Sequence, residues 1–184
     1  GHTPGSTGIA VDIGTTTVAM YWYDLNTGRL LGERSAINQQ RAAGADVISR
    51  INACETDPRM LGRLCDSMVN QLNEMLEGLL QSLPGQKAPS QCIIAGNTTM
   101  LHLLAALDPS GIAHAPFTPQ SLFGTEYQAG QLGIHLDAVV YLPPCISAYV
   151  GGDITAGLTG CGLDKEEGTA LFVDIGTNGE MALS

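Results

Sequence analysis

The sequence Val-Asp-Ile-Gly-Thr-Thr-Thr at residues 11–17 decides how this chain folds, and its first five letters return unchanged at residues 173–177. Apolar residues precede each copy, and a second apolar run follows at residues 18–23 and 181–183. Two apolar runs joined by a glycine-containing turn are typical of a β-hairpin. We therefore expect two similar hairpins, one near each end of the chain.

Both turns carry groups that can bind phosphate. Gly14 and Gly176 can adopt positive φ and expose backbone N–H groups, which hold phosphate oxygens together with threonine hydroxyls. The aspartate beside each turn would repel phosphate unless Mg²⁺ lay between them, and Mg²⁺ prefers carboxylate, water and phosphate oxygens. One copy alone would indicate an ordinary turn, whereas the matched pair favours two walls that clamp a polyphosphate–metal unit.

The composition limits the partners of the chain. Its 184 residues suit one domain or two small lobes. The net charge is −10 with only 8 lysines and arginines, so nucleic acid is a poor partner and bound phosphate must rely on backbone, hydroxyls and metal. The sequence lacks the Walker pattern, a signal peptide and an apolar run of membrane-spanning length, which predicts a cytoplasmic protein that does not bind membranes.

The five cysteines form no C-x-x-C pair, and we interpret them as reduced, mostly buried thiols of a cytoplasmic protein. A metal or cluster site shared by two or three of them stays open as the less favoured alternative. They are Cys54, Cys65, Cys92, Cys145 and Cys161.

The first half of the chain predicts a β-meander followed by helices. Strands are expected at residues 9–14, 16–24 and 29–35. Asp46 is placed to begin one helix, and Asp57 is placed to cap the next, whose apolar residues recur at three- and four-residue steps before Pro84-Gly85 ends it. This apolar face predicts packing against the sheet.

In the second half, a strand at residues 91–95 runs into a helix that begins near Asn97, where open α/β sheets bind ligands. Residues 108–137 show no clear period, and a strand is expected at residues 139–142. The helix after Tyr149 is rich in small residues, which indicates close approach of another backbone. Asp153, at its start, is either a capping carboxylate or a functional one.

This order of elements resembles the superfamily of actin, sugar kinases and heat-shock chaperone ATPases. The resemblance implies an α/β, ribonuclease-H-like (actin-like ATPase) lobe, with a mixed sheet flanked by helices, plus the first hairpin of a second lobe. We expect residues 1–7 to be a linker or cloning remnant, residues 8–168 to be the first lobe, and residues 169–184 to start a truncated second lobe. The absence of an initiator methionine supports the expectation of a fragment.

Five motifs resemble the reductive activators of corrinoid proteins more narrowly. Asn-Gln-Gln at residues 38–40 departs from the Asn-Pro-Gln of that family. The motifs are DIGTTTVA (12–19), GADVISRI (44–51), GNTTMLH (96–102), VGGDI (150–154) and DIGTNGE (174–180).

The resemblance implies an ATPase whose ATP hydrolysis drives the reduction of Co(II) to Co(I) in a corrinoid protein. ATP and Mg²⁺ are the implied cofactors, and a [2Fe–2S] cluster is expected only in an N-terminal ferredoxin domain outside these residues. The implied partner is a corrinoid protein or a corrinoid-dependent methyltransferase, and a homodimer is allowed. The fragment alone is expected to be inactive and to bind nucleotide weakly or not at all.

The resemblance also implies roles for individual residues. Gly96, Asn97 and Thr98 are expected at the cleft rim or in contact with the partner. Asp12 and Asp174 are expected to hold Mg²⁺ through its waters, and Asp153 is expected to orient or deprotonate the attacking water. The residues expected to bind phosphate are Gly14, Thr15, Thr16 and Thr17 on one side and Gly176, Thr177, Asn178 and Gly179 on the other.

Three other functions stay open. The first is an activator of 2-hydroxyacyl-CoA dehydratases, which shares a [4Fe–4S] cluster across a dimer, although no clustered cysteines support it. The second is a sugar or small-molecule kinase, which would transfer phosphate to a substrate. The third is a non-catalytic actin-like scaffold, which the paired aspartates argue against.

Overall fold

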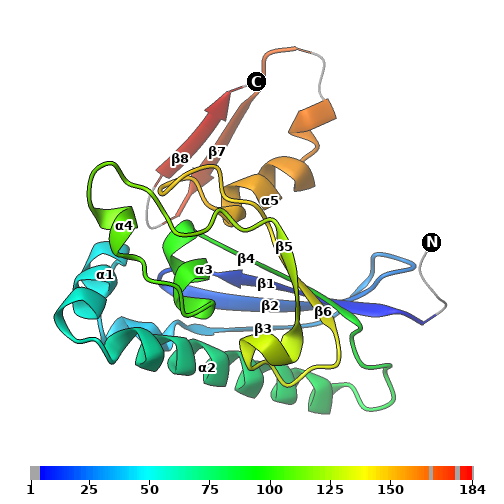
Figure 1. Cartoon of the computed structure of the whole chain (residues 1–184). Coiled ribbons are helices and arrows are strands. Elements are labelled where there is room, and N and C mark those ends of the chain that lie inside the picture. The colour runs from blue at the N-terminus through cyan, green and yellow to red at the C-terminus, as the bar shows by residue number, and fades with distance from the viewer. Residues whose placement is uncertain (1–4, 166–167, 177–178, 184) are drawn as a thin grey trace.

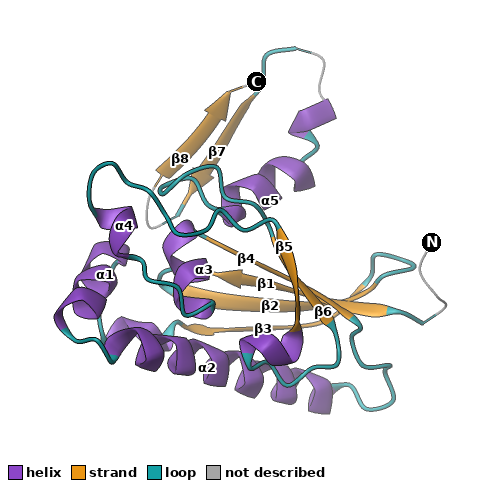
Figure 2. Ribbon diagram, viewed as in Figure 1, coloured by secondary structure: helices purple, strands orange, loops and turns teal. Residues whose placement is uncertain are grey.

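A computed structural model describes residues 5–165, 168–176 and 179–183 of the chain. Six strands form one mixed sheet in the order β3-β2-β1-β4-β6-β5, and two further strands pair as a separate hairpin (Figures 1 and 2). The strands are β1 (Thr7–Ile13), β2 (Thr17–Asp24), β3 (Leu30–Ile37), β4 (Gln91–Gly96), β5 (Thr125–Gln128), β6 (Val139–Leu142), β7 (Leu171–Ile175) and β8 (Gly179–Leu183). The helices are α1 (Val47–Thr56), α2 (Met60–Ser82), α3 (Thr98–Leu104), α4 (Ser110–Ala113) and α5 (Gly152–Gly160), with 3-10 turns η1 (Gln39–Ala42), η2 (Ala129–Leu132) and η3 (Leu163–Lys165).

The predicted meander is confirmed, with β1 antiparallel to β2 and β2 antiparallel to β3. Strand β1 begins at Thr7, two residues before the expected start of the first strand. Because side chains alternate between the two faces of a strand, Val11 and Ile13 enter the core while Asp12 points to the opposite face. Strand β4 runs parallel to β1, which brings Gly96 beside Ile13 at the same edge of the sheet.

Helix α2 crosses one face of the sheet and buries the predicted apolar stripe, including Leu64, Met68 and Leu72. The prediction that Asp57 caps this helix was wrong. The N–H of Asp57 donates to the carbonyl of Ala53, so Asp57 ends α1, and α2 begins only at Met60. Helix α2 begins three residues after Asp57, with Arg59 at its N-cap position, so the Asp57 carboxylate accepts from the Arg59 N–H and not from the first turn of α2.

Helix α1 begins as predicted at Asp46. Its carboxylate accepts a hydrogen bond from the Ser49 N–H at 2.7 Å, and the Ser49 side chain accepts one from the Asp46 N–H at 3.1 Å. This reciprocal cap satisfies two of the N–H groups that a helix start leaves unpaired. The first turn of α1 is thus held in one orientation.

The segment without period at residues 108–137 contains short elements rather than one regular structure. Helix α4 packs beside α1, and β5 adds an antiparallel edge strand to β6. Within the described residues, no helix combines the length and the apolar character that crossing a membrane requires.

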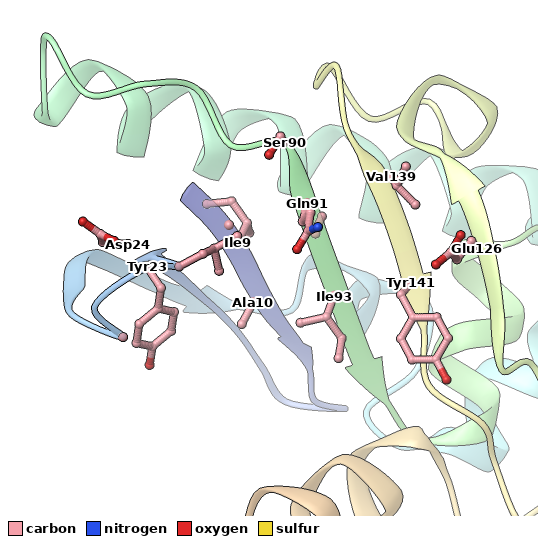
Figure 3. Close-up of a pocket in the computed structure, with 14 residues that line it drawn as sticks. Ile9, Ala10, Tyr23, Asp24, Ser90, Gln91, Ile93, Glu126, Val139 and Tyr141 are labelled. Atoms are coloured by element: carbon pink, nitrogen blue, oxygen red, sulfur yellow. The ribbon is translucent and has the colours of Figure 1, made fainter. Parts of the chain in front are cut away.

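The sheet face that lies away from α2 is partly open. Ala10, Ile93 and Tyr141 lie side by side on β1, β4 and β6, in a hollow of about 820 Å³ (Figure 3). The same face, nearer the carboxyl ends of β1 and β4, is covered by α5, and the β7–β8 hairpin lies beyond α5 (Figure 1). That placement brings the two repeated motifs toward each other.

Candidate functional site

The first repeated motif forms a tight turn between β1 and β2. The N–H of Gly14 donates to the carbonyl of Thr17 at 2.9 Å, and a Cβ atom on Gly14 would lie 2.6 Å from that oxygen. Glycine is needed here because two backbone segments approach closely. The expectation of positive φ was wrong for Gly14, whose φ lies outside that range.

Three successive carbonyl groups of this turn are held from the protein interior. The side-chain amide of Asn38 donates to the Gly14 carbonyl at 2.8 Å, and its backbone N–H donates to the Thr16 carbonyl at 2.8 Å. The guanidinium of Arg50 donates to the Thr15 carbonyl at 2.5 Å. Because C=O and N–H point in opposite directions across a trans peptide, each of these bonds turns the following N–H away from the core.

The anchoring residue Asn38 belongs to the Asn-Gln-Gln segment, where the resemblance led us to expect Asn-Pro-Gln. Asn38 is fully buried and caps η1 by accepting from the Gln40 N–H at 2.9 Å. Glutamine at position 39 leaves an N–H in place of a proline ring, and that N–H donates to Oε1 of Gln71 at 2.9 Å. The N–H of Gln39 therefore finds an acceptor on α2.

The two repeated hairpins line one cleft of about 260 Å³. Thr177 and Asn178 lie outside the described residues, and Gly179 lines the neighbouring cavity. The residues that line the cleft are Asp12, Gly14, Thr15, Thr16, Thr17, Asn97, Asp153, Asp174, Gly176 and Glu180.

Helix α5 reaches the cleft because glycines at its start allow close backbone contact, as the small-residue pattern indicated. A Cβ on Gly151 would lie 2.5 Å from Cα of Asn97, and one on Gly152 would lie 3.0 Å from the Pro143 carbonyl. The starts of α3 and α5 therefore meet beside the end of β4. Asp153, in the first turn of α5, consequently lines the cleft.

The second hairpin packs against α5 through an aromatic side chain. The ring of Phe172 on β7 lies over Gly157, where an added Cβ would come within 2.8 Å of Cζ. This contact leaves Asp174, two residues further along the strand, on the side of the cleft. The absence of a side chain at Gly157 thus allows the hairpin to approach α5 closely.

Acidic groups dominate the electrostatics of the cleft. Partial desolvation, followed by the negative charges of Asp153 and Asp174, raises the pKa of Asp12. Desolvation and the charge of Asp174 also raise the pKa of Asp153, although the Ile154 N–H that donates to its carboxylate opposes the rise. Among the described residues that line the cleft, none is a lysine or an arginine.

Glu180 is a cleft residue that the sequence-based assignments of roles did not include. It follows the second turn on β8, and desolvation together with Asp153 and Asp174 raises its pKa. Its place in the repeated hairpin, one residue beyond Gly179, was the signal that could have identified it. The first repeat has a different residue after its turn, so a comparison of the two copies did not point to Glu180.

Asn97 and Thr98 have different roles at the start of α3. Asn97 caps the helix by accepting from the Met100 N–H at 2.9 Å, while its amide donates to Oγ1 of Thr15 at 3.1 Å. Thr98 is fully buried, and its hydroxyl donates to the carbonyl of Ser147 at 2.7 Å. Asn97 therefore lies at the rim as expected, and the Thr98 hydroxyl faces the interior.

The donor set suits a cation that keeps its water shell. In the described part of the chain, no three His, Cys, Asp or Glu side chains converge closely enough to ligate one metal ion directly. The carboxylates of the cleft nevertheless raise one another's pKa, which a divalent cation between them would reverse. All five cysteines are free, and Cys92 and Cys145 are buried among them.

Comparison with known proteins agrees with this architecture. The chain is 36% identical over 179 residues to the corrinoid activation enzyme RamQ of Eubacterium limosum, covering 96% of this chain and 30% of that protein. It superposes on the solved structure of a reductive activator for corrinoid, iron-sulfur protein with a TM-score of 0.92 at 39% identity, covering 100% of this chain and 30% of that one. The chain thus spans about a third of the length of these relatives.

A more distant similarity concerns the fold alone. A 2-dehydro-3-deoxygalactonokinase structure from Sinorhizobium meliloti matches with a TM-score of 0.50 at 15% identity, over 96% of this chain and 49% of that one. The α/β fold with a mixed sheet, expected from the sequence, is therefore confirmed, and this kinase structure shares it. The model of the RACo middle region matches residues 7–166, so the chain belongs to the RACo middle region family.

Proposed function

We propose that this chain is the phosphate-binding part of an ATPase module in a larger protein that reductively activates a corrinoid protein. The observation that carries the proposal is the convergence of both repeated hairpins on one cleft, with Asp12, Asp153 and Asp174 along its walls. In this proposal residues 8–168 form the first lobe, and residues 169–184 begin the second.

The residues of the cleft fit a magnesium–polyphosphate group. The anchored carbonyls direct backbone N–H groups of residues 15–17 away from the core, where they and the threonine hydroxyls donate to phosphate oxygens. Gly176 lines the opposite wall, and the proposal assigns phosphate contacts to it, to Gly179 and to Thr177 and Asn178, which lie outside the described residues. Asp12 and Asp174 would hold Mg²⁺ through its waters, and the bound ion would neutralise charge on both the acids and the phosphates.

Asp153 is assigned to the attacking water. It lies between the two hairpins in the first turn of α5, and its raised pKa makes the carboxylate a better proton acceptor than an ordinary aspartate. Glu180, on the opposite wall, is the second group that can orient the water. In phosphoryl transfer such residues act mainly by positioning and electrostatics.

Coupling to corrinoid reduction is supported by the names of the two corrinoid activators that this chain resembles. One electron, supplied by a [2Fe–2S] cluster elsewhere in the full protein, would convert Co(II) to Co(I) in the bound corrinoid protein or methyltransferase. Nucleotide-dependent closure of the two lobes would shift this reduction through differential binding of the partner. The acidic surface favours a partner with a complementary basic patch.

A second candidate is phosphoryl transfer to a small molecule. A cavity of about 500 Å³ adjoins the cleft and shares Thr15, Asn97 and Glu180 with it. Asp46 and Tyr149 line its far side, so a polar acceptor would have room beside the phosphates. Release of inorganic phosphate without a phosphorylated product separates hydrolysis from this alternative.

The test uses the full-length protein with its iron–sulfur domain and measures both ATP hydrolysis and formation of Co(I). Asp12→Asn is expected to weaken the dependence on Mg²⁺ and to lower hydrolysis at least about 100-fold, in the range for loss of one charged group at a phosphoryl-transfer site. Asp153→Asn should lower kcat by a similar factor while MgATP still binds. Asp137→Asn is the control because Asp137 is exposed and lies outside the cleft.

Unchanged hydrolysis in both cleft variants would contradict the proposed site. Hydrolysis that is lost in Asp12→Asn while Co(I) still forms at the wild-type rate would separate the ATPase from corrinoid activation. Both results are readable because Asp12 points away from the core, so its substitution should preserve the fold.

A further inference from the structure

Arg50 is the buried cation of this chain. Of the 8 lysines and arginines, the other seven have exposed side chains, whereas Arg50 is fully enclosed. It belongs to the motif GADVISRI at residues 44–51, to which the proposed function assigns no role. Its guanidinium lies directly behind the first phosphate-binding turn, with Nη2 donating to the carbonyl of Thr15.

The surroundings hold the guanidinium in one orientation. Nε donates to the carbonyl of Gly44 at 3.0 Å, and Nη1 lies 3.1 Å from the sulfur of Met100 and 3.4 Å from Oε1 of Gln40. A Cβ on Gly44 would lie 2.8 Å from the backbone N of Arg50, so glycine is needed for this path. The Asp46–Ser49 cap fixes the helix turn from which the side chain leaves.

Within the described residues, the positive charge of Arg50 forms no ion pair. Its hydrogen-bond partners in the described chain are carbonyl, amide and thioether groups, and the ion pairs there involve other residues. Asp46 acts on it only at a distance and caps the helix. A guanidinium stays protonated in proteins, and burying a charge without a partner destabilises the fold. An anion that binds on the outer side of the turn between β1 and β2 would offset the cost of burying the Arg50 charge behind it.

We infer that Arg50 is a positioning residue for the nucleotide phosphates, and this inference rests on the proposed function. It orients the Thr15–Thr16 peptide so that the N–H is directed away from the core. It also provides a fixed positive charge in a low-dielectric setting, where charges interact more strongly than in water. This explains how a cleft lined by carboxylates attracts a polyphosphate when no lysine or arginine of the described chain lines it.

Gln40 gives the sharpest test because it can neutralise Arg50 without removing it. Its Oε1 faces Nη1 of Arg50, and its Nε2 donates to the carbonyl of Leu64 at 2.9 Å. Gln40→Glu and Gln40→Met both lose the bond to Leu64, but only glutamate places a negative charge against the guanidinium. The two variants therefore differ chiefly in whether the charge of Arg50 is cancelled.

The experiment measures MgATP binding by calorimetry and the thermal unfolding midpoint of the full-length protein and of each variant. We expect the affinity of Gln40→Glu for MgATP to be at least about tenfold weaker than that of Gln40→Met, as for loss of a close charge pair. The unfolding midpoint of Gln40→Glu without nucleotide should equal or exceed that of Gln40→Met. KM for ATP should rise in Gln40→Glu while kcat changes less.

Equal affinities in these two variants, in a wild type that binds MgATP, would overturn the inference. A wild type that does not bind MgATP would instead contradict the proposed function. Arg50→Lys and Arg50→Met provide a second comparison if a Gln40 variant does not fold. The inference expects lysine to retain more MgATP affinity than methionine, and equal loss in both would count against it.

Discussion

The side-chain amide of Asn97 donates a hydrogen bond to Oγ1 of Thr15 over 3.1 Å, although 82 residues separate them. The same side chain accepts from the Met100 N–H and so begins α3. One residue thus fixes both a helix start and a hydroxyl of the turn between β1 and β2. Strands β1 and β4 make this contact possible because they lie parallel and end at the same edge of the sheet.

Asn97→Asp separates the capping of α3 from the hydrogen bond to Thr15. Aspartate caps a helix as well as asparagine does, so the free energy of unfolding should change by less than about 1 kcal/mol. The donor to Thr15 is lost, however, and a further negative charge enters the cleft, so affinity for MgATP should fall at least about tenfold. Calorimetry and urea denaturation of the same preparations measure the two effects.

Asn97→Ala is the matched control for that substitution. It removes the cap as well as the Thr15 contact and should destabilise the fold by about 1 kcal/mol, while adding no charge. Affinity for MgATP should therefore fall less in Asn97→Ala than in Asn97→Asp. The reverse order would show that packing at the rim, rather than charge, controls the cleft.

The raised pKa of Asp12 predicts an unusual dependence of stability on pH. The folded chain holds the Asp12 proton more tightly than the unfolded chain, so this group destabilises the fold increasingly as pH rises from about 4 through the folded pKa. Without divalent cations, Asp12→Asn should be more stable than wild type at pH 7. The difference should disappear toward pH 4 in urea denaturation.

Asp57 supplies the control of opposite sign. The side chain and backbone N–H of Arg59 donate to its carboxylate and lower its pKa. Stability from such a group is present above the unfolded pKa and lost as pH falls through the folded one. Asp57→Asn should therefore be less stable than wild type at pH 7 and should approach it at low pH. Identical pH profiles for the two variants would contradict both assignments.

The parts of the fold that local chemistry determines could be predicted from the sequence. The repeated hairpin motif, the Asp46 cap and the apolar stripe of α2 each depend on residues close together in the chain, and the structure contains all three. Asp57 was misassigned because the same residue suits the end of one helix and the start of the next. The elements of residues 108–137 could not be predicted from the sequence, because β5 forms only through its tertiary pairing with β6.

The candidate site divides in the same way. The groups at the turn were identified because glycine, threonine and aspartate at that spacing indicate phosphate and metal binding without reference to the rest of the chain. Asn38 and Arg50 were not identified, because their importance arises only when residues 24 and 35 positions away in the chain bring carbonyl groups to them. A buried arginine without an ion pair cannot be recognised in a sequence, since most arginines are exposed.

Gly151 gives a last prediction, because it lies where α3 and α5 meet. A methyl group there would come within 2.5 Å of Cα of Asn97 and 2.7 Å of Oδ1 of Asp153, so Gly151→Ala must shift both. We expect a loss of about 1–3 kcal/mol in stability, typical of overpacking, together with reduced ATP hydrolysis. Gly160→Ala, in the same helix with no atom within 4 Å of the added methyl, should be neutral or stabilising. Equal stability of the two variants would mean that the close approach at Gly151 is not what holds Asp153 in the cleft.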